Sequence, residues 1–315
     1  MSKYQDRDAD KIKQRRWTEI RREWMNYVPE RDSPWPVPEH EVSELPTVDD
    51  CIRNFVGNEI QDVTIDNEIG GLRAAVIHES VIWIHKAGNV LRAAALEGTH
   101  GYRTWSRSSA YHAAFFAIRG LLGLLGVTVF NIASRSFDYQ VDLWAERNNR
   151  PGPTDSRFAV RIIRRSRRVE HKELWGIFLR VLRVTKIDSE VWPLWEKDPL
   201  KKMLEPGPFS HVRRQIHYRS AGWHFRDLDT LDNTDDFKQL AEQVAKLTHL
   251  ATPEDDDFPA SLALYVLSMG AALIADLGKD IPKLDAEAKR MDSWMQASPW
   301  QCANAFMLIE TGGNK

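Results

Sequence analysis

Two long amphipathic stretches separated by one short loop dominate the first half of the chain. Between residues 72 and 96, apolar side chains recur at alternating spacings of three and four, which predicts a helix with one apolar face. The same pattern returns from Ser106 to Gly126, where the glycine provides a natural helix stop. Because the connecting sequence GTHGYRTW is short, the two helices are predicted to pack as an antiparallel pair.

The periodicity changes after these helices. Residues 128–133 and 139–146 alternate in twos around the turn-like sequence SRSFD, which predicts a β-hairpin inserted into a helical domain. Helical spacing then returns at residues 169–184. The predicted fold class is therefore mainly α, a helical bundle with an inserted β-hairpin and additional N- and C-terminal helices.

Further helices are predicted toward both ends. Residues 8–27 form a charged stretch whose narrow apolar stripe makes a marginal helix, able to dock elsewhere or on a partner chain. The proline-rich stretch 29–46 that follows has no apolar periodicity and indicates an extended arm. The C-terminal part is predicted to hold three helices, around 237–247, 259–277 and 283–297.

These elements divide the chain into four segments. They are an N-terminal helix and Pro-rich arm (1–46), a connecting segment (47–71), a helical domain (72–226) and a C-terminal helical extension (227–315). A chain of 315 residues has room for one large domain or two smaller ones, each with its own core.

Composition and charge exclude several classes of protein. With 43% hydrophobic and 28% charged residues, the chain is typical of soluble globular proteins rather than disordered ones. Cys51 and Cys302 have no second cysteine at metal-ligand spacing, so zinc fingers and CxxC redox motifs are excluded and a reducing compartment is favoured. The charged amino terminus lacks the apolar core of a signal peptide, and a cytoplasmic location is expected. The net charge of −2 means that nucleic-acid binding would need a local patch.

One uncharged stretch, residues 258–275, approaches the length of a membrane span. It contains Pro259, Ser261, Ser268 and Gly270 and is only modestly hydrophobic. We therefore expect a buried helix here and no association with a membrane.

Basic and titratable side chains are concentrated in the segment SHVRRQIHYRSAGWHF. Its candidate functional residues are Arg213, Arg214, His217, Tyr218, Arg219 and His224. An arginine offers phosphate oxygens a permanently charged fork, and a histidine can transfer a proton near neutral pH. Together they suffice to cleave RNA without a metal, with the 2′-hydroxyl of the RNA as nucleophile. The alternative is that the arginines form surface ion pairs with nearby carboxylates and the histidines cap or pack.

Two segments of the chain resemble the helical HEPN family. The stretch from Ser106 to Gly126 begins in a Ser-rich turn and runs as a Tyr/Ala/Phe/Ala sequence into leucines and glycine, similar to the second helix of that family. The HEPN catalytic signature lies two helices later, an arginine followed after four to six residues by a histidine. The segment from Arg213 to His224 stands at a matching place, so the likeness covers about residues 72–226.

The resemblance implies a metal-independent endoribonuclease of toxin or antiviral-defence type, with no cofactor. It also implies a homodimer, because active HEPN members build the nuclease site where two copies of the Arg/His helix meet. If these arginine and histidine residues do not catalyse cleavage, the resemblance implies an inactive member of the family.

Two residue pairs are candidates for the catalytic signature. Arg219 and His224 match its spacing, although Gly222 between them weakens a continuous helix by about 1 kcal/mol relative to alanine. Arg213 and His217 have one intervening residue too few but share a helix face. Both pairs remain candidates.

The arginine-rich sequence RFAVRIIRRSRR is a second candidate region. As a helix it would present Arg157, Arg161, Arg164 and Arg168 on one face, suited to a phosphate backbone or an acidic partner. The alternative is a solvated face balanced by neighbours such as Glu170 and Glu173. The candidate nucleic-acid-binding residues are Arg157, Arg161, Arg164, Arg165, Arg168 and Arg214.

Other residue types give weaker signals. The chain has twelve tryptophans, and core positions are expected for most. Six of them have polar neighbours, which favour interfaces or base stacking: Trp17, Trp24, Trp35, Trp195, Trp294 and Trp300. His78 and His85 are expected in the core or at its boundary. The sequence has no phosphate-binding glycine loop, GxSxG or HExxH motif, and we expect no metal site.

Two functions remain open. The first is the ribonuclease, a dimer acting on RNA and held in check by a regulatory partner. The second is a non-catalytic adaptor whose tryptophan-rich arms and basic stripe bind a protein or nucleic acid in a larger complex.

Overall fold

The chain is mainly helical with a small antiparallel sheet. A computed structural model of the chain describes residues 12–27, 47–53, 62–67, 69–100, 102–132, 136–152, 156–193, 200, 258–282 and 284–289. It divides into two compact units, one formed by residues 1–80 and 122–188, the other by residues 81–121 and 189–315. The helices α3 (Leu72–Thr99) and α4 (Arg103–Leu124) contribute to both units.

The first unit contains a four-stranded antiparallel sheet in the order β2-β5-β4-β3. Its strands are β2 (Asp62–Ile65), β3 (Val127–Phe130), β4 (Tyr139–Ala145) and β5 (Ala159–Arg164). The predicted hairpin is confirmed as β3 and β4, with Val127 opposite Asp142 and Phe130 opposite Tyr139. The hairpin is not an isolated insertion, because β5 and β2 extend it into a sheet. These two strands are not predicted by the pattern of the sequence.

The N-terminal segment of the first unit packs within its own chain. Strand β1 (Arg15–Arg16) pairs in parallel with β6 (Thr185–Lys186) and leads directly into α1 (Trp17–Tyr27). The helix begins at Trp17, later than the residue 8 predicted from the sequence, and residues 1–11 lie outside the described part. Trp17, Ile20 and Trp24 are completely buried. The apolar stripe therefore belongs to this chain's core rather than to a partner.

Helix α5 (His171–Val184) confirms the helix predicted at residues 169–184. The Glu173 carboxylate accepts a hydrogen bond of 3.0 Å from the backbone N–H of Glu170, which satisfies a donor at the helix start. The Arg167 guanidinium donates hydrogen bonds to the carboxylates of Glu170 and Glu173, at 2.8 Å each. One side of the helix is then buried from Leu174 to Leu182.

The Asp66 side chain, directly after β2, binds the loop that follows β4. The Asp66 carboxylate accepts the backbone N–H groups of Asn148 at 2.9 Å and Asn149 at 3.0 Å. The hydrogen bond from Asn148 is the main cause that lowers the pKa of Asp66. These bonds hold residues 148 and 149 of the loop against the end of β2.

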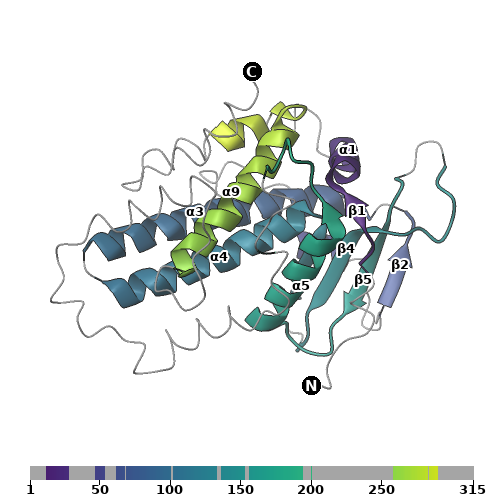
Figure 1. Cartoon of the computed structure of the whole chain (residues 1–315). Coiled ribbons are helices and arrows are strands. Elements are labelled where there is room, and N and C mark those ends of the chain that lie inside the picture. The colour runs from purple at the N-terminus through teal and green to yellow at the C-terminus, as the bar shows by residue number, and fades with distance from the viewer. Residues whose placement is uncertain are drawn as a thin grey trace. The chain divides into compact units, whose positions relative to one another are not determined.

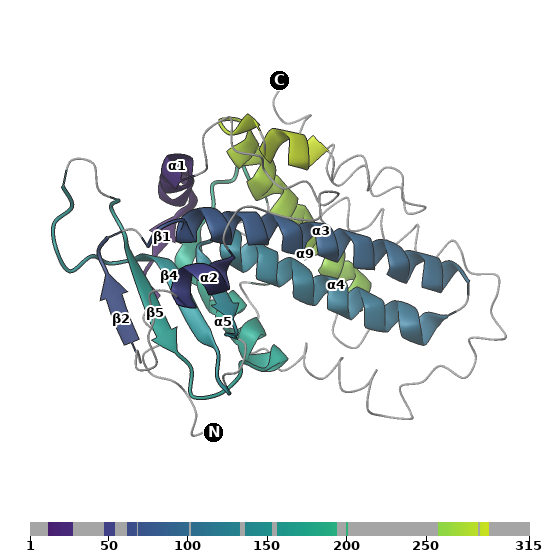
Figure 2. The same cartoon turned by 180° about the vertical axis from the view of Figure 1, so that it is seen from behind.

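The second unit contains most of α3 and α4, together with α9 (Phe258–Gly278). The predicted antiparallel pair is confirmed, because α3 and α4 lie side by side in Figure 1 and from behind in Figure 2. Ser106 donates a hydrogen bond of 2.7 Å from its hydroxyl to the Ala94 carbonyl, tying the start of α4 to α3. Helix α9 comes close to α3, since a Cβ at Gly270 would lie 2.7 Å from the Ile84 Cδ1.

Helix α9 confirms the helix predicted at residues 259–277. Among the described residues it is the one helix long and apolar enough to cross a membrane, and 94% of its most apolar 18-residue window is buried. The burial fits the core helix expected from the sequence. Residues 284–289 are helical within the predicted stretch 283–297. The predicted arm at 29–46 and the helix around 237–247 lie outside the described residues.

The passage from α4 to β3 depends on Gly126, which adopts a φ of +81°. A Cβ added there would lie 1.7 Å from Nε1 of Trp144, so an L side chain meets both backbone strain and a steric clash. We expect Gly126→Ala to lower the free energy of unfolding by about 2–4 kcal/mol, measured by urea denaturation. Gly88→Ala is the matched control.

Gly88 lies within α3, and its added Cβ would meet no atom within 4 Å. Alanine there should leave stability unchanged or raise it by about 1 kcal/mol, because alanine is the better helix former. Equal stability of the two variants would contradict the assigned role of Gly126.

Candidate functional site

The Arg/His segment predicted to be catalytic lies outside the described residues. It contains Arg213, His217, Tyr218, Arg219 and His224, as well as the candidate phosphate ligand Arg214. The two candidate pairs therefore remain equal alternatives, and their chemistry remains a prediction from the sequence.

The arginine-rich stretch is described, and it does not form the helix that would place Arg157, Arg161, Arg164 and Arg168 on one face. Residues 159–164 form strand β5, in which Arg161 lies opposite Asp142 and Arg164 lies opposite Tyr139. Successive side chains of a strand point to opposite faces, so Arg161 and Arg164 lie on different faces of the sheet. The stretch does not form a single basic helix face.

The two arginines of β5 and the one that follows it contact other residues of the first unit. The Arg161 guanidinium binds the Asp62 carboxylate in bidentate fashion, with bonds of 3.0 and 2.6 Å. The guanidinium carbon of Arg164 lies 3.9 Å from the ring centroid of Phe137. Arg165 is buried, and its guanidinium donates to the side-chain oxygen of Gln140 at 3.5 Å.

The remaining arginines of the stretch are exposed. The side chain of Arg157 lies at the surface, while its backbone N–H donates to Glu23 at 3.4 Å. Arg168 is also exposed. Arg167 forms ion pairs with Glu170 and Glu173, the two carboxylates named in the solvated-face alternative. The outward basic charge of this region is therefore smaller than the count of arginines suggests.

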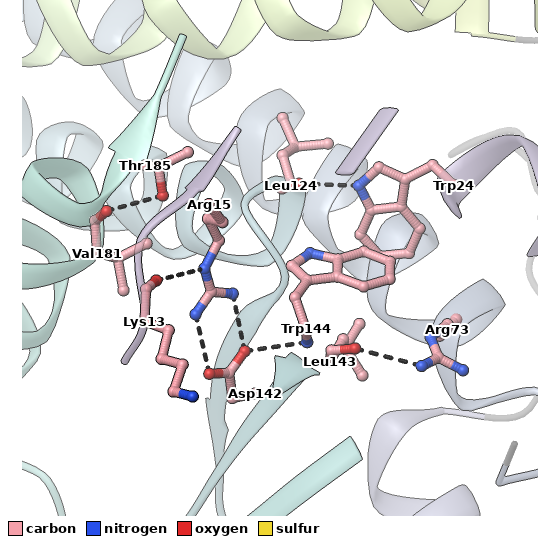
Figure 3. A network of polar contacts seen from close by, with 10 residues as sticks. All are labelled: Lys13, Arg15, Trp24, Arg73, Leu124, Asp142, Leu143, Trp144, Val181 and Thr185. Carbon is pink, nitrogen blue, oxygen red and sulfur yellow. Dashed lines mark hydrogen bonds and ion pairs between the residues drawn. The ribbon is translucent and has the colours of Figure 1, made fainter. Parts of the chain in front are cut away.

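A buried network attaches the N-terminal segment to the sheet (Figure 3). The Arg15 guanidinium donates to both carboxylate oxygens of Asp142, at 2.8 and 2.9 Å, and both side chains are buried. The Trp144 backbone N–H donates to the same carboxylate at 3.1 Å. Nearby, the indole N–H of Trp24 donates to the Leu124 carbonyl at 2.9 Å. We interpret this network as structural, because its polar groups are closed to solvent and bind one another.

The histidines of α3 occupy the positions expected from the sequence. His78 and His85 are 5% and 4% exposed, so their placement in the core is confirmed. His85 Nε2 lies 2.7 Å from the carboxylate of Glu287, which is also buried. This contact links α3 to residues 284–289 within the second unit.

The described tryptophans divide between core and surface. Of those predicted to favour interfaces, Trp17 and Trp24 are completely buried, and the others lie outside the described residues. Trp24 packs edge-on against Trp144 with ring centroids 4.9 Å apart. Trp105, in contrast, is 54% exposed on α4.

A cluster of two aromatic rings and two cations lies across α3 and α4 in the second unit. We call it the cation–aromatic platform, formed by Trp83 and Lys86 of α3 and by Phe116 and Arg119 of α4. The two rings stack with centroids 5.5 Å apart and an interplanar angle of 28°. The Lys86 Nζ lies 4.3 Å from the Phe116 centroid, and the Arg119 guanidinium carbon lies 4.5 Å from the Trp83 ring.

This platform was not predicted from the sequence, although each helix carries a local signal for it. In each helix an aromatic residue is followed three positions later by a cation, so both side chains share one helix face. The pairing of the two faces depends on the antiparallel register of the helices, which the sequence does not show.

The cysteine and the potential metal ligands of the described residues give no sign of a catalytic site. The Cys51 thiol is buried, and burial raises its pKa, which makes it a poor nucleophile. Within the described ranges, no group of three or more His, Cys, Asp or Glu side chains is arranged to hold a metal ion.

No family model, curated protein or solved structure matches this chain.

Proposed function

We propose that this chain is a HEPN-like, metal-independent endoribonuclease of toxin or antiviral-defence type that acts as a homodimer. The observation that supports the proposal most is the order of its elements. The antiparallel pair α3 and α4 carries the HEPN-like sequence Ser106–Gly126, and the Arg/His-rich segment follows at residues 213–224. The hydrogen bond from the Ser106 hydroxyl to the Ala94 carbonyl explains why a serine is present near the start of α4.

The proposed reaction needs only groups that the Arg/His segment supplies. An arginine binds the scissile phosphate, and a histidine accepts the proton of the 2′-hydroxyl. The 2′-oxygen then bonds to phosphorus while the bond from phosphorus to the 5′-oxygen breaks, and the leaving 5′-oxygen takes up a proton from a protonated histidine of the dimeric site. The products are a 2′,3′-cyclic phosphate and a 5′-hydroxyl end. The candidate residues are Arg213 with His217 or Arg219 with His224.

The test is cleavage of end-labelled single-stranded RNA in excess EDTA, beside the same sequence made of DNA. We expect the RNA to be cut to products with 2′,3′-cyclic phosphate ends and the DNA to stay intact, because DNA lacks the nucleophile. Cleavage that stops in EDTA would contradict the metal-independent mechanism. Absence of cleavage across several RNAs would favour the adaptor function.

The adaptor function is retained as the second candidate because of an exposed apolar cluster near the α3–α4 connection. Leu96, Tyr102 and Trp105 are 52%, 59% and 54% exposed. Exposed large apolar side chains gathered near one loop are typical of protein-binding surfaces. An adaptor would depend on these residues and would keep its binding after loss of both candidate histidines.

A further inference from the structure

Two cations stand side by side on the two-stranded sheet of the first unit. Strands β1 and β6 pair in parallel, with Arg15 opposite Thr185 and Arg16 opposite Lys186. Arg15 and Thr185 are buried, whereas Arg16 and Lys186 are exposed. Because neighbouring strands lie about 4.8 Å apart, the two exposed residues are direct neighbours on the outer side of this sheet. We propose that Arg16 and Lys186 together bind a phosphate group that carries two negative charges.

The two cations have no counter-charge among the described residues. Like charges at directly opposite positions destabilise a sheet. Within the described part of the chain, neither Arg16 nor Lys186 has an ion pair or a side-chain hydrogen bond, and the carboxylates nearest to them in sequence, Glu19 and Asp188, do not bind them. Lys13, in contrast, is paired with Glu146. A bound anion would supply the charge that these residues leave unbalanced.

The backbone that carries the two cations is fixed from the inner side of the sheet (Figure 3). The Arg15 guanidinium holds β1 on the Asp142 carboxylate through hydrogen bonds of 2.8 and 2.9 Å. The Thr185 hydroxyl donates to the Val181 carbonyl at 2.8 Å, which ties the start of β6 to the end of α5. The two positions are therefore held together before a ligand arrives, which lowers the cost of binding.

The chemistry of the two cations favours a doubly charged phosphate over a carboxylate. An arginine presents a planar fork that matches two phosphate oxygens, and a lysine presents a compact charge suited to a further oxygen. Inorganic phosphate and a phosphate monoester offer three or more oxygens and about two charges near neutral pH. A carboxylate, or a phosphate inside a nucleic-acid backbone, has one charge and would balance only one of the cations.

The first experiment measures the Tm of the full chain in inorganic phosphate and in sodium chloride at equal ionic strength. A ligand that binds the folded chain raises the Tm. Phosphate also stabilises proteins in general by exclusion from their surface, so variants must be compared with the wild type. We expect Arg16→Gln and Lys186→Gln each to weaken the apparent phosphate affinity roughly 1.5- to 5-fold, the range for one exposed ion pair. The double variant should retain only the general effect.

A matched control uses a cation outside the proposed site. Lys172 is exposed and lies at the opposite end of α5 from Lys186, so Lys172→Gln should keep the phosphate response of the wild type. Arg16→Lys keeps the charge without the fork and should lie between the wild type and Arg16→Gln. Because the substituted side chains are exposed, the far-UV circular dichroism of each variant should match that of the wild type.

A second measurement distinguishes the two sources of such a phosphate. Fluorescence anisotropy compares two labelled 2′-O-methyl oligonucleotides that differ only in a 5′-phosphate. Tighter binding of the phosphorylated probe, lost in the double variant, would assign the site to nucleic-acid ends. Equal binding of both probes, with the phosphate response of the Tm retained, would assign it to free phosphate. Neither probe has the 2′-hydroxyl nucleophile, so both results are independent of the proposed ribonuclease.

Two results would overturn the proposal. The first is an equal rise in Tm with phosphate in the wild type and in the folded double variant, together with no preference for the phosphorylated probe. The second is binding of an acidic polyglutamate peptide that is tighter than that of phosphate and is lost in the double variant. That result would assign the two cations to a protein partner.

Discussion

Replacing Arg15 by alanine is expected to lower the free energy of unfolding by about 3–5 kcal/mol, the usual cost of leaving a buried charge without its partner. The Arg15 guanidinium and the Asp142 carboxylate are both buried and joined by two hydrogen bonds (Figure 3). Without Arg15, the Asp142 carboxylate loses the cation that it binds, in a position where its side chain is only 7% exposed. Urea denaturation followed by far-UV circular dichroism measures the effect.

Two matched variants separate this buried pair from surface charge. Lys13 forms an exposed ion pair with Glu146, so Lys13→Ala should change stability by less than about 1 kcal/mol. The double variant Arg15→Met/Asp142→Leu should recover most of the lost stability, because no charge is left buried. The Trp144 backbone N–H loses its acceptor in that variant, which keeps recovery incomplete by about 1 kcal/mol. A loss below 1 kcal/mol for Arg15→Ala would contradict the structural role of the network.

The second large effect is expected in the Arg/His segment. Removing the histidine that transfers the proton should reduce the rate of RNA cleavage by about 10²- to 10⁴-fold, the usual contribution of general acid–base catalysis. His217→Ala and His224→Ala should therefore differ strongly, since one of them removes the catalytic group. His100→Ala, an exposed histidine outside the segment, is the control. Single-turnover rates on labelled RNA measure the effect.

The arginine variants identify the partner of the catalytic histidine. If His224 is catalytic, Arg219→Ala should lose cleavage and Arg213→Ala should lose less. If His217 is catalytic, the order should be reversed. Equal and small effects of all four variants would indicate that the segment does not carry the reaction.

The helices of the chain could be predicted because their signals are local. Apolar residues at helical spacing located α3, α4, α5 and α9 to within a few residues of their observed bounds. Gly126 marked the end of the second helix correctly, since its positive φ is available to glycine at little cost. Alternation in twos likewise located the hairpin of β3 and β4.

Strand β5 was missed for a physical reason. Across residues 157–168, which include β5, arginines recur at spacings of three and four, as on one face of a helix, while β-branched Val160, Ile162 and Ile163 favour a strand. Pairing with β2 and β4 decides between the two conformations, and Arg161 gains its Asp62 partner only in that sheet. Such long-range pairing leaves no local mark in the sequence.

The contacts that matter most were also the least predictable. Arg15 and Asp142 are 127 residues apart, and no spacing rule connects them. The cation–aromatic platform had a local signal in each helix, but the meeting of the two faces depends on tertiary packing. The role proposed for the Arg/His segment, in contrast, is inferred from the sequence alone.

The proposed function requires that residues of the Arg/His segment cleave RNA without a metal. Its most direct test compares the wild-type chain with a His217→Ala/His224→Ala double variant, purified alike, on labelled single-stranded RNA in excess EDTA. The proposal predicts cleavage to 2′,3′-cyclic phosphate ends by the wild type and none by the folded double variant. Equal cleavage by both proteins, or none by the wild type, would contradict it.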